Sequence, residues 1–417
     1  MWMLTEKKQY PWIVVGMLWV VALLNYLDRQ MLSTMRPFMM EDISELVSVT
    51  NFGHLMAIFL WVYAFMSPFS GMIADWLNRK WMIVISLLVW SSVTLMMGYA
   101  QNLEQLYVLR AIMGISEAFY VPASLSLIVD YHQGKSRSLA IGFHTTGIYL
   151  GQALGGFGAT IATYTSWQFT FHSFGMIGII YSVILIAFLR EKKTYVIEKS
   201  QRSSSLKDFV FAFKGFSILL GNISFWTLIF YFSAPSLPGW ATKNWLPTLF
   251  CDTLHLDMAH SGPLATIVIS FSSLIGVLMG GYISDKWVQK HLKGRIYTGV
   301  IGVCLTIPAL FLLGYGQGLT AILSGAFCFG LGFGVFDVNN MPIICQFVSS
   351  RYRSTAYGIL NLVGISAGAI VTNELGKAIE SGYMDIVFLV MIATLCVAIT
   401  LQLIVLHPKT IDMKNDL

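Results

Sequence analysis

The chain has 417 residues, of which 56% are hydrophobic and only 11% are charged, and its mean hydropathy is +0.68. Because a soluble protein carries roughly a quarter charged residues, this composition excludes an ordinary soluble domain. The formal net charge of +5 does not indicate a nucleic-acid partner, because membrane topology accounts for the surplus of basic residues.

The hydropathy of the chain predicts twelve membrane-spanning helices, since one span needs about 20 mostly apolar residues. In chain order, the predicted spans are residues 12–33, 52–73, 81–100, 104–129, 138–162, 168–189, 218–250, 262–284, 296–315, 319–346, 354–375 and 384–406. The first is longer than a signal-peptide core and no cleavage site follows it, so we interpret it as a retained span. The seventh is too long for one straight span, and we expect Pro235, Pro238 and Gly239 to bend or unwind it.

The distribution of Lys and Arg predicts the orientation. With twelve spans and a cytoplasmic N-terminus, all but five of the 26 Lys and Arg residues fall on the cytoplasmic side. The exceptions are Arg29, Arg36, Arg110, Lys243 and Lys377. By the positive-inside rule, this bias predicts a multi-pass protein of the inner (plasma) membrane with both termini in the cytoplasm.

A basic, Ser-rich stretch at residues 190–214 separates the first six predicted spans from the last six. This composition is typical of a linker between two bundles. The sequence therefore predicts an N-terminal six-helix bundle at residues 1–190, a cytoplasmic linker at 191–214 and a C-terminal six-helix bundle at 215–417.

Three short matches relate the two halves. GMIADW at 71–76 recurs as GYISDK at 281–286, RSLAIG at 137–142 recurs as RSTAYG at 353–358, and Gly114, Glu117 and Pro122 keep their spacing in Gly334, Asp337 and Pro342. The offsets are 210, 216 and 220 residues, and the matches fall at the same place in corresponding helices. They predict a duplicated transporter with its substrate site at the interface of the repeats, near the bilayer midplane.

In the first third of the chain, four charged residues lie well inside predicted spans: Asp28, Arg29, Arg110 and Glu117. A charge at membrane depth costs on the order of 3 kcal/mol or more, so it usually marks an ion or substrate path. The helical rise places Asp28 and Arg110 at similar depth, which predicts an ion pair between them. Glu117 lies two turns deeper in apolar surroundings, which suits a carboxyl group that takes up and releases a proton. The alternative is a fixed charge network that only holds the first and fourth helices together.

Further candidates for substrate contact come from both halves. Lys243 could meet a substrate carboxylate or extend to the membrane interface, and Asp337 could line the cavity or serve a structural or gating role. The amides of Gln152 and Asn361 suit sugar hydroxyls. Four aromatic residues could flank a sugar ring or simply pack: Tyr26, Tyr63, Tyr149 and Trp245. Three glycines at a spacing of four indicate close helix packing: Gly147, Gly151 and Gly155.

A set of residues at the predicted cytoplasmic helix ends could lock the two halves together in one state of the transport cycle. Its members are Gly71, Asp75, Arg79, Lys80, Asp130, Arg137, Asp285 and Arg353. The alternative, charge that only sets the topology, explains the basic residues but not the repeated Asp.

The loop GMIADWLNRK at residues 71–80 resembles the signature loop of the major facilitator superfamily, with Asn78 in place of the second Gly. NYLDR at 25–29, RxxxGxxEA at 110–118 and WLP at 245–247 resemble the anion:cation symporter branch of that superfamily, which includes hexuronate and galactonate permeases and sialin. The first two motifs are also similar to Spinster-type transporters. The resemblance implies an all-α membrane protein with twelve transmembrane helices in two pseudo-symmetric six-helix bundles. Matched by motif, it implies that Asp28 and Glu117 are proton-coupling acids and that Arg29 lies near bound substrate.

Together these features predict a symporter that takes up a small organic anion with protons, as a monomer in the lipid bilayer. The expected anion is a sugar acid, such as a hexuronate, an aldonate or sialic acid. The alternatives are a Spinster-like lysolipid or sphingolipid transporter and a membrane sensor, although the linker and tail are short for a signalling domain. The eight His and five Cys are dispersed, and no phosphate loop or catalytic triad occurs, so we expect no metal, no cofactor and no enzymatic activity.

Overall fold

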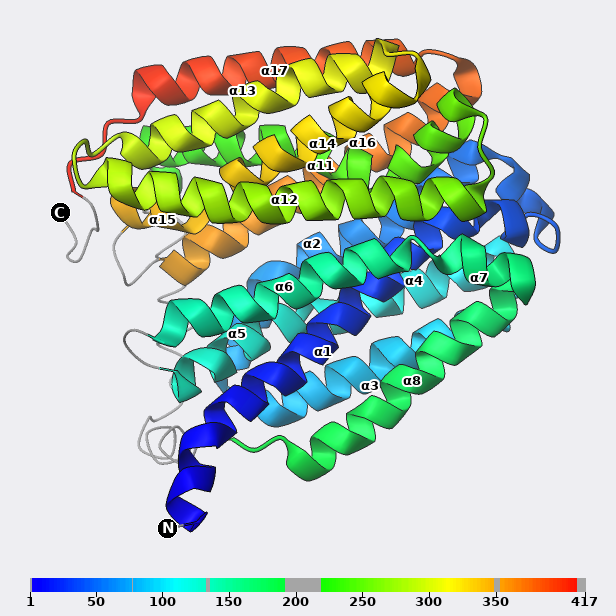
Figure 1. Ribbon diagram of the computed structural model, residues 1–417, viewed down its shortest axis with the longest axis horizontal. Coiled ribbons are helices and arrows are strands. Elements are labelled where there is room, and N and C mark those ends of the chain that lie inside the picture. Colours follow the sequence, from blue (N-terminus) through cyan, green and yellow to red (C-terminus); the bar gives the residue numbers. More distant parts are fainter. Residues whose placement is uncertain (1, 77, 133–135, 192–218, 349–352, 411–417) are drawn as a thin grey trace.

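The computed structural model describes residues 2–76, 78–132, 136–191, 219–348 and 353–410, and within these ranges the chain is helical and contains no β-strand (Figure 1). The prediction of an all-α membrane protein is confirmed. The first turns of α1 and the last turns of α17 lie at the same end of the molecule, called here the terminal end, and the opposite end is called the distal end.

The N-terminal half forms one bundle of antiparallel helices. It contains α1 (Trp2–Met39), the 3-10 helix η1 (Ser44–Val47), α2 (Val49–Trp76), α3 (Arg79–Met97), α4 (Leu103–Ala118), α5 (Tyr120–Tyr131), α6 (Arg137–Gly155), α7 (Gly158–Tyr164) and α8 (Trp167–Phe188). Asn78 is the N-cap of α3, and its side chain accepts a hydrogen bond of 3.1 Å from the Trp81 N–H. This cap gives a structural role to the residue that departs from the signature loop.

The C-terminal half forms the second bundle. It contains α11 (Ile223–Leu254), α12 (Met258–Val288), α13 (Gly294–Tyr315), α14 (Gly318–Asp337), α15 (Asn340–Phe347), α16 (Arg353–Ser381) and α17 (Met384–Val405). The predicted linker at 191–214 lies outside the described residues, except for residue 191.

The helices follow the twelve predicted spans, with α4–α5, α6–α7 and α14–α15 each making one span from two segments. Among the described residues, ten stretches are long and apolar enough to cross a membrane. The fifth and seventh predicted spans, α6–α7 and α11, are not among them, because they carry polar residues such as Gln152 and Lys243. Pro235, Pro238 and Gly239 do not unwind the seventh span, since α11 is one continuous helix of 32 residues, and a bend at these residues stays a prediction.

The two bundles meet along α2 and α16, and at the distal ends of α6 with α12 and of α1 with α11. Gln30 Nε2 donates to the Lys243 carbonyl at 2.7 Å, Thr160 Oγ1 donates to the Ala259 carbonyl at 2.6 Å, and Ser48 Oγ donates to a carboxylate oxygen of Glu380 at 3.0 Å. These bonds lie toward the distal end, which is therefore closed. Toward the terminal end, α6 and α12 diverge (Figure 1).

Close packing of α6 against α1 positions the helices of the site. A Cβ atom on Gly147 would lie 2.6 Å from the Trp19 carbonyl, and one on Gly155 would lie 2.7 Å from the Leu27 carbonyl. A larger side chain at either position would push the two helices apart. The predicted packing role of the glycine ladder is confirmed.

Candidate functional site

An ion pair joins α1 to α4 close to the interface of the two bundles. Arg29 Nε on α1 hydrogen-bonds to a carboxylate oxygen of Glu117 on α4. The Glu117 side chain is 0% exposed, and that of Arg29 is 10% exposed. Because both charges are removed from water, each needs the other, and losing one partner would leave a buried unpaired charge.

Three aromatic rings surround the Arg29 guanidinium. Its Cζ atom lies 4.9 Å from the ring centre of Tyr26, 4.9 Å from that of Phe59 and 4.7 Å from that of Tyr63. Gly114 allows this arrangement, because a Cβ atom there would lie 2.8 Å from the Phe59 carbonyl. The close approach of α2 to α4 thus brings two aromatic side chains of α2 over the arginine, where cation–π attraction stabilises its charge.

The predicted interaction between Asp28 and Arg110 is electrostatic and not a direct ion pair, since no ion pair within 4 Å joins them in the described part of the chain. Asp28 instead accepts a hydrogen bond of 3.2 Å from Thr94 Oγ1 on α3, and it is 4% exposed. The guanidinium of Arg110 lies 4.4 Å from the ring centre of Phe59, and its Nη1 atom lies 3.2 Å from Met113 Sδ. Consecutive helical residues point about 100° apart, so Asp28 faces α3 while Arg29 faces α4. Matching depth alone does not fix this direction.

The C-terminal half places an acid and a base at the same interface. Asp337 ends α14 and accepts a hydrogen bond of 3.1 Å from Asn340 Nδ2. Lys243 Nζ on α11 lies 5.0 Å from the ring centre of Trp240 and 5.6 Å from that of Phe333, which is one turn before Asp337. Lys243 and Asp337 interact electrostatically.

Asp337 is exposed, although it lies at the centre of the helical span. It interacts electrostatically with Tyr26 and Tyr149 of the other bundle and with Tyr357 on α16. Its exposed surface therefore faces the space between the bundles rather than lipid.

The same break in helical structure follows both interface acids. Glu117 lies in the last turn of α4 and Pro122 in the first turn of α5, while Asp337 and Pro342 hold the same places in α14 and α15. Proline lacks the N–H that would continue the helical hydrogen-bond ladder, so each span divides just beyond its acid. The two halves thus share a local structure where their sequences share the spacing of acid and proline.

The other predicted substrate contacts divide into two groups. Tyr26, Tyr63 and Tyr149 lie with Arg29 or Asp337 at the interface. Trp245 instead packs between α2, α11 and α16, where it is 3% exposed, and its Nε1 donates to the Thr372 carbonyl at 2.9 Å. This placement favours the packing alternative for Trp245.

The two predicted amides occupy different surroundings. Gln152 is 7% exposed on α6, beside the contact of α6 with α1. Asn361 is partly buried on α16, one turn after Tyr357.

Sequence reasoning missed Tyr357. Its side chain is 41% exposed, and it interacts electrostatically with Asp337, Tyr26 and Tyr63, which places it among the interface residues. It occupies the position in RSTAYG that Ile141 occupies in RSLAIG. A polar residue replacing an apolar one between repeats is the signal that could have identified it.

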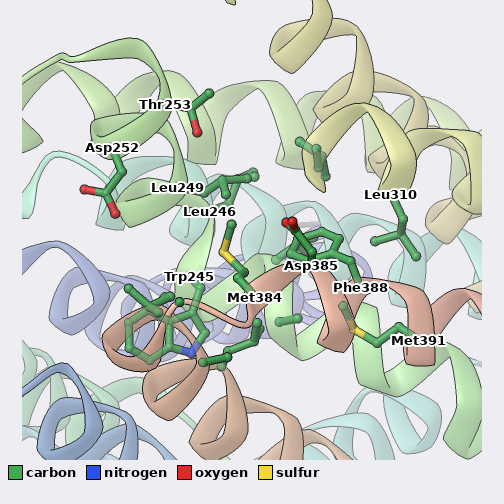
Figure 2. A pocket seen from close by; sticks show the side chains of 17 residues that line it. Trp245, Leu246, Leu249, Asp252, Thr253, Leu310, Met384, Asp385, Phe388 and Met391 are labelled. Atoms are coloured by element: carbon green, nitrogen blue, oxygen red, sulfur yellow. The ribbon is translucent and has the colours of Figure 1, made fainter. Parts of the chain in front are cut away.

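A separate cavity of about 330 Å³ lies in the distal half of the C-terminal bundle, between α11, α13, α16 and α17. Figure 2 shows its apolar walls, with Trp245, Phe388 and Met391 among the lining side chains and the carboxylates of Asp252 and Asp385 at its margins. Neither ion-pair partner of the interface, Arg29 or Glu117, reaches it.

The charged residues at the terminal end form ion pairs inside each bundle. Arg79 pairs with Asp130, and Arg295 Nη2 lies 3.9 Å from Asp285 Oδ1. Arg353 donates to the Val348 carbonyl at 3.2 Å, and Lys80 donates to the Ile186 carbonyl at 2.8 Å. Gly71, Asp75 and Arg137 are in helices, but their surroundings lie outside the described part of the structure. A lock between the halves stays a prediction.

The described residues hold no group of three or more His, Cys, Asp or Glu that could bind a metal ion. At the interface, Arg29 and Lys243 each interact with an acid of a neighbouring helix, Glu117 and Asp337.

A family model described as the Major Facilitator Superfamily matches residues 18–372. The chain belongs to the Major Facilitator Superfamily. It is therefore a multi-pass membrane transporter and not an enzyme, and the predicted resemblance is confirmed.

Individual relatives agree with this assignment. The chain is 26% identical over 334 residues to a hexuronate transporter of Bacillus subtilis (strain 168), covering 77% of this chain and 75% of the relative. It is 25% identical over 408 residues to a chloroplastic ascorbate transporter of Arabidopsis thaliana, covering 93% and 73%.

The fold resembles the crystal structure of a bacterial homologue of the human lysosomal transporter Spinster, in its inward-facing and unoccupied conformation. The TM-score is 0.72 at 19% identity, over 95% of this chain and 96% of the other.

Proposed function

We propose that this transporter takes up a small organic anion, a sugar acid such as a hexuronate, together with protons. The observation that carries the proposal is the buried Arg29–Glu117 ion pair at the bundle interface. Similarity to a hexuronate transporter supports the substrate class.

The ion pair offers a direct way to couple a proton to an anion. While Glu117 is charged, it occupies Arg29. When Glu117 binds a proton, Arg29 needs another counter-ion, and a substrate carboxylate fits its planar guanidinium through two parallel hydrogen bonds. Binding the anion without the proton would leave a buried charge unpaired, which costs about 3–5 kcal/mol. Proton and anion therefore bind together.

The remaining interface residues suit a sugar ring. Tyr26, Tyr63 and Tyr149 provide flat faces and hydroxyl groups around the arginine. Tyr357 adds a hydroxyl from the other bundle. Such groups hydrogen-bond to sugar hydroxyls while their rings contact its C–H faces.

The proposed topology gives this conformation a place in alternating access. The proposed protein is a monomer in the inner membrane with both termini in the cytoplasm. In that orientation the closed distal end faces outward. The site then communicates with the cytoplasm. In this proposal residues 1–190 and 215–417 are the two moving bundles, and residues 191–214 link them.

Uptake by reconstituted protein tests the proposal. Purified protein in liposomes is given radiolabelled galacturonate with and without an inward proton gradient. We expect accumulation that depends on the gradient and collapses with a protonophore. Uptake indifferent to the gradient would overturn the coupling, and no uptake of any sugar acid would overturn the substrate class. Competition by lysophosphatidylethanolamine, with none by galacturonate, would instead support a Spinster-like lipid transporter.

A further inference from the structure

Lys243 and Arg29 occupy corresponding places in the two repeats. Their offset is 214 residues, within the range of 210 to 220 that relates the other repeated positions. Each lies on the first helix of its half, α1 or α11, and each is associated with an acid on the fourth span of that half, Glu117 or Asp337. The duplication has therefore placed a basic residue and an acid together on each side of the interface, Arg29 with Glu117 and Lys243 with Asp337.

The side chain of Lys243 does not extend to the membrane surface. Its ammonium group lies over the rings of Trp240 on α11 and Phe333 on α14, and the residue is partly buried. This geometry disfavours the alternative in which Lys243 reaches the membrane interface, because the group is directed toward the neighbouring helix at the depth of Asp337.

Lys243 lacks the direct partner that Arg29 has. Among the described residues, its Nζ atom makes no hydrogen bond and no ion pair within 4 Å. Rings alone compensate a buried ammonium only in part, since a cation–π contact is worth about 0.5–2 kcal/mol. A position for an anionic group therefore remains beside Lys243.

Arg29 and Lys243 both lie beside the space between the two bundles. Gln30, the residue after Arg29, donates through Nε2 to the Lys243 carbonyl at 2.7 Å, so α1 and α11 are in contact at this level. Asp337 interacts with Tyr26 and Tyr149 across the interface. One substrate between the bundles would thus meet Arg29 on one side and Lys243 on the other.

We propose that the substrate is a dicarboxylate, an aldarate whose first carboxylate binds Arg29 and whose second binds Lys243. This inference rests on the proposed function and narrows its substrate class. A monocarboxylate sugar acid would place a hydroxyl group near Lys243 and leave the ammonium without a direct ion pair, with only the electrostatic interaction with Asp337. A charged hydrogen bond is about twice as strong as a neutral one, so the diacid binds more tightly.

Galactarate and galactonate form a matched pair of probes, because both are open chains with the same stereochemistry and differ only in carboxylate or alcohol at C6. Competition against radiolabelled galacturonate, with wild-type protein in liposomes, measures both affinities. We expect galactarate to bind at least tenfold more tightly than galactonate, which corresponds to about 1.4 kcal/mol. Equal affinity, or tighter binding of galactonate, would overturn the inference.

Variants of Lys243 assign the preference to that residue. Lys243→Gln should reduce the ratio of the two affinities to about one, while Lys243→Arg should keep galactarate preferred. A Lys243→Gln variant that retains the wild-type ratio would overturn the role of Lys243. If Lys243→Gln does not fold, the inference is still tested by the ratio of galactarate to galactonate affinity in the wild-type protein and in Lys243→Arg.

The proposed function fails in a different way from this inference. Proton-driven uptake of galactonate or galacturonate, with no preference for galactarate, would overturn the proposed diacid substrate and leave the proposed function standing. If neither sugar acid nor diacid binds, the proposed function itself is wrong.

Discussion

The two halves share a scaffold but differ at its centre. In the N-terminal half the interface acid, Glu117, is fully buried and directly paired with Arg29. In the C-terminal half the corresponding acid, Asp337, is exposed, and Lys243 makes no direct ion pair with a described residue. The comparison indicates that duplication supplied one helix geometry twice. In the proposed mechanism, the N-terminal copy holds the proton-linked charge and the C-terminal copy faces the substrate.

Replacing each acid by its amide should separate these roles most strongly. Glu117→Gln should abolish proton-driven accumulation of galacturonate while keeping exchange, because the amide resembles the protonated acid but cannot release a proton. Asp337→Asn is the matched control and should keep the dependence on the proton gradient. Uptake into liposomes with and without a gradient measures both. Full accumulation by Glu117→Gln would show that coupling lies elsewhere.

Arg29→Ala should lower affinity for a carboxylate substrate by roughly 30-fold or more, because truncating one partner of a desolvated charge pair typically costs about 2–5 kcal/mol. Arg29→Lys should recover only part of this loss, since an ammonium lacks the planar fork of a guanidinium. Arg110→Ala is the control, because Arg110 packs on Phe59 and Met113 and interacts with Glu117 only electrostatically, without a direct ion pair. Substrate competition gives the affinities, and loss of binding only in the Arg110 variant would reverse these assignments.

The shared scaffold predicts an equal response of both halves to glycine substitution. A Cβ atom on Gly114 would meet the Phe59 carbonyl, and one on Gly334 would meet the Ser273 carbonyl. Gly114→Ala and Gly334→Ala should each lower the free energy of unfolding by about 1–3 kcal/mol, because backbone must move. Gly142→Ala, where a Cβ atom meets nothing within 4 Å, is the control. Melting temperatures in detergent check this, and an unaffected Gly334→Ala variant would break the symmetry of the scaffold.

The smallest effect is expected at Tyr357. Tyr357→Phe removes a hydroxyl from the substrate side of the interface and should weaken binding by a few fold, since one hydrogen bond is worth about 0.5–1.5 kcal/mol. The dependence of uptake on the proton gradient should not change. A changed gradient dependence would mean that the C-terminal half also carries the proton.

The sequence predicted the spans and the duplication because both depend on local signals. Apolar length marks a span, and the spacing of Gly, acid and Pro survived in both copies. The importance of Arg29 and Glu117 was also visible, because charge inside a span is costly.

The partners of these charges were not predictable. Depth along a helix follows from residue number, but direction around its axis depends on how neighbouring helices pack. Asp28 and Arg29 therefore have different partners although they are adjacent. The choice between substrate contact and packing for Trp245 stayed open for the same reason, because the contact of α2 with α16 that buries it is a long-range feature.

The hydrogen bonds that close the distal end also affect how the transporter responds to its surroundings. Thr160 and Gln30 both donate to main-chain carbonyls, and the third bond, from Ser48 to the Glu380 carboxylate, is not an ion pair, so this seal depends little on paired surface charges. Added salt weakens exposed ion pairs but leaves neutral hydrogen bonds nearly unchanged. The rate at which the distal end opens should accordingly vary little with ionic strength, which uptake measured over a range of KCl concentrations would check.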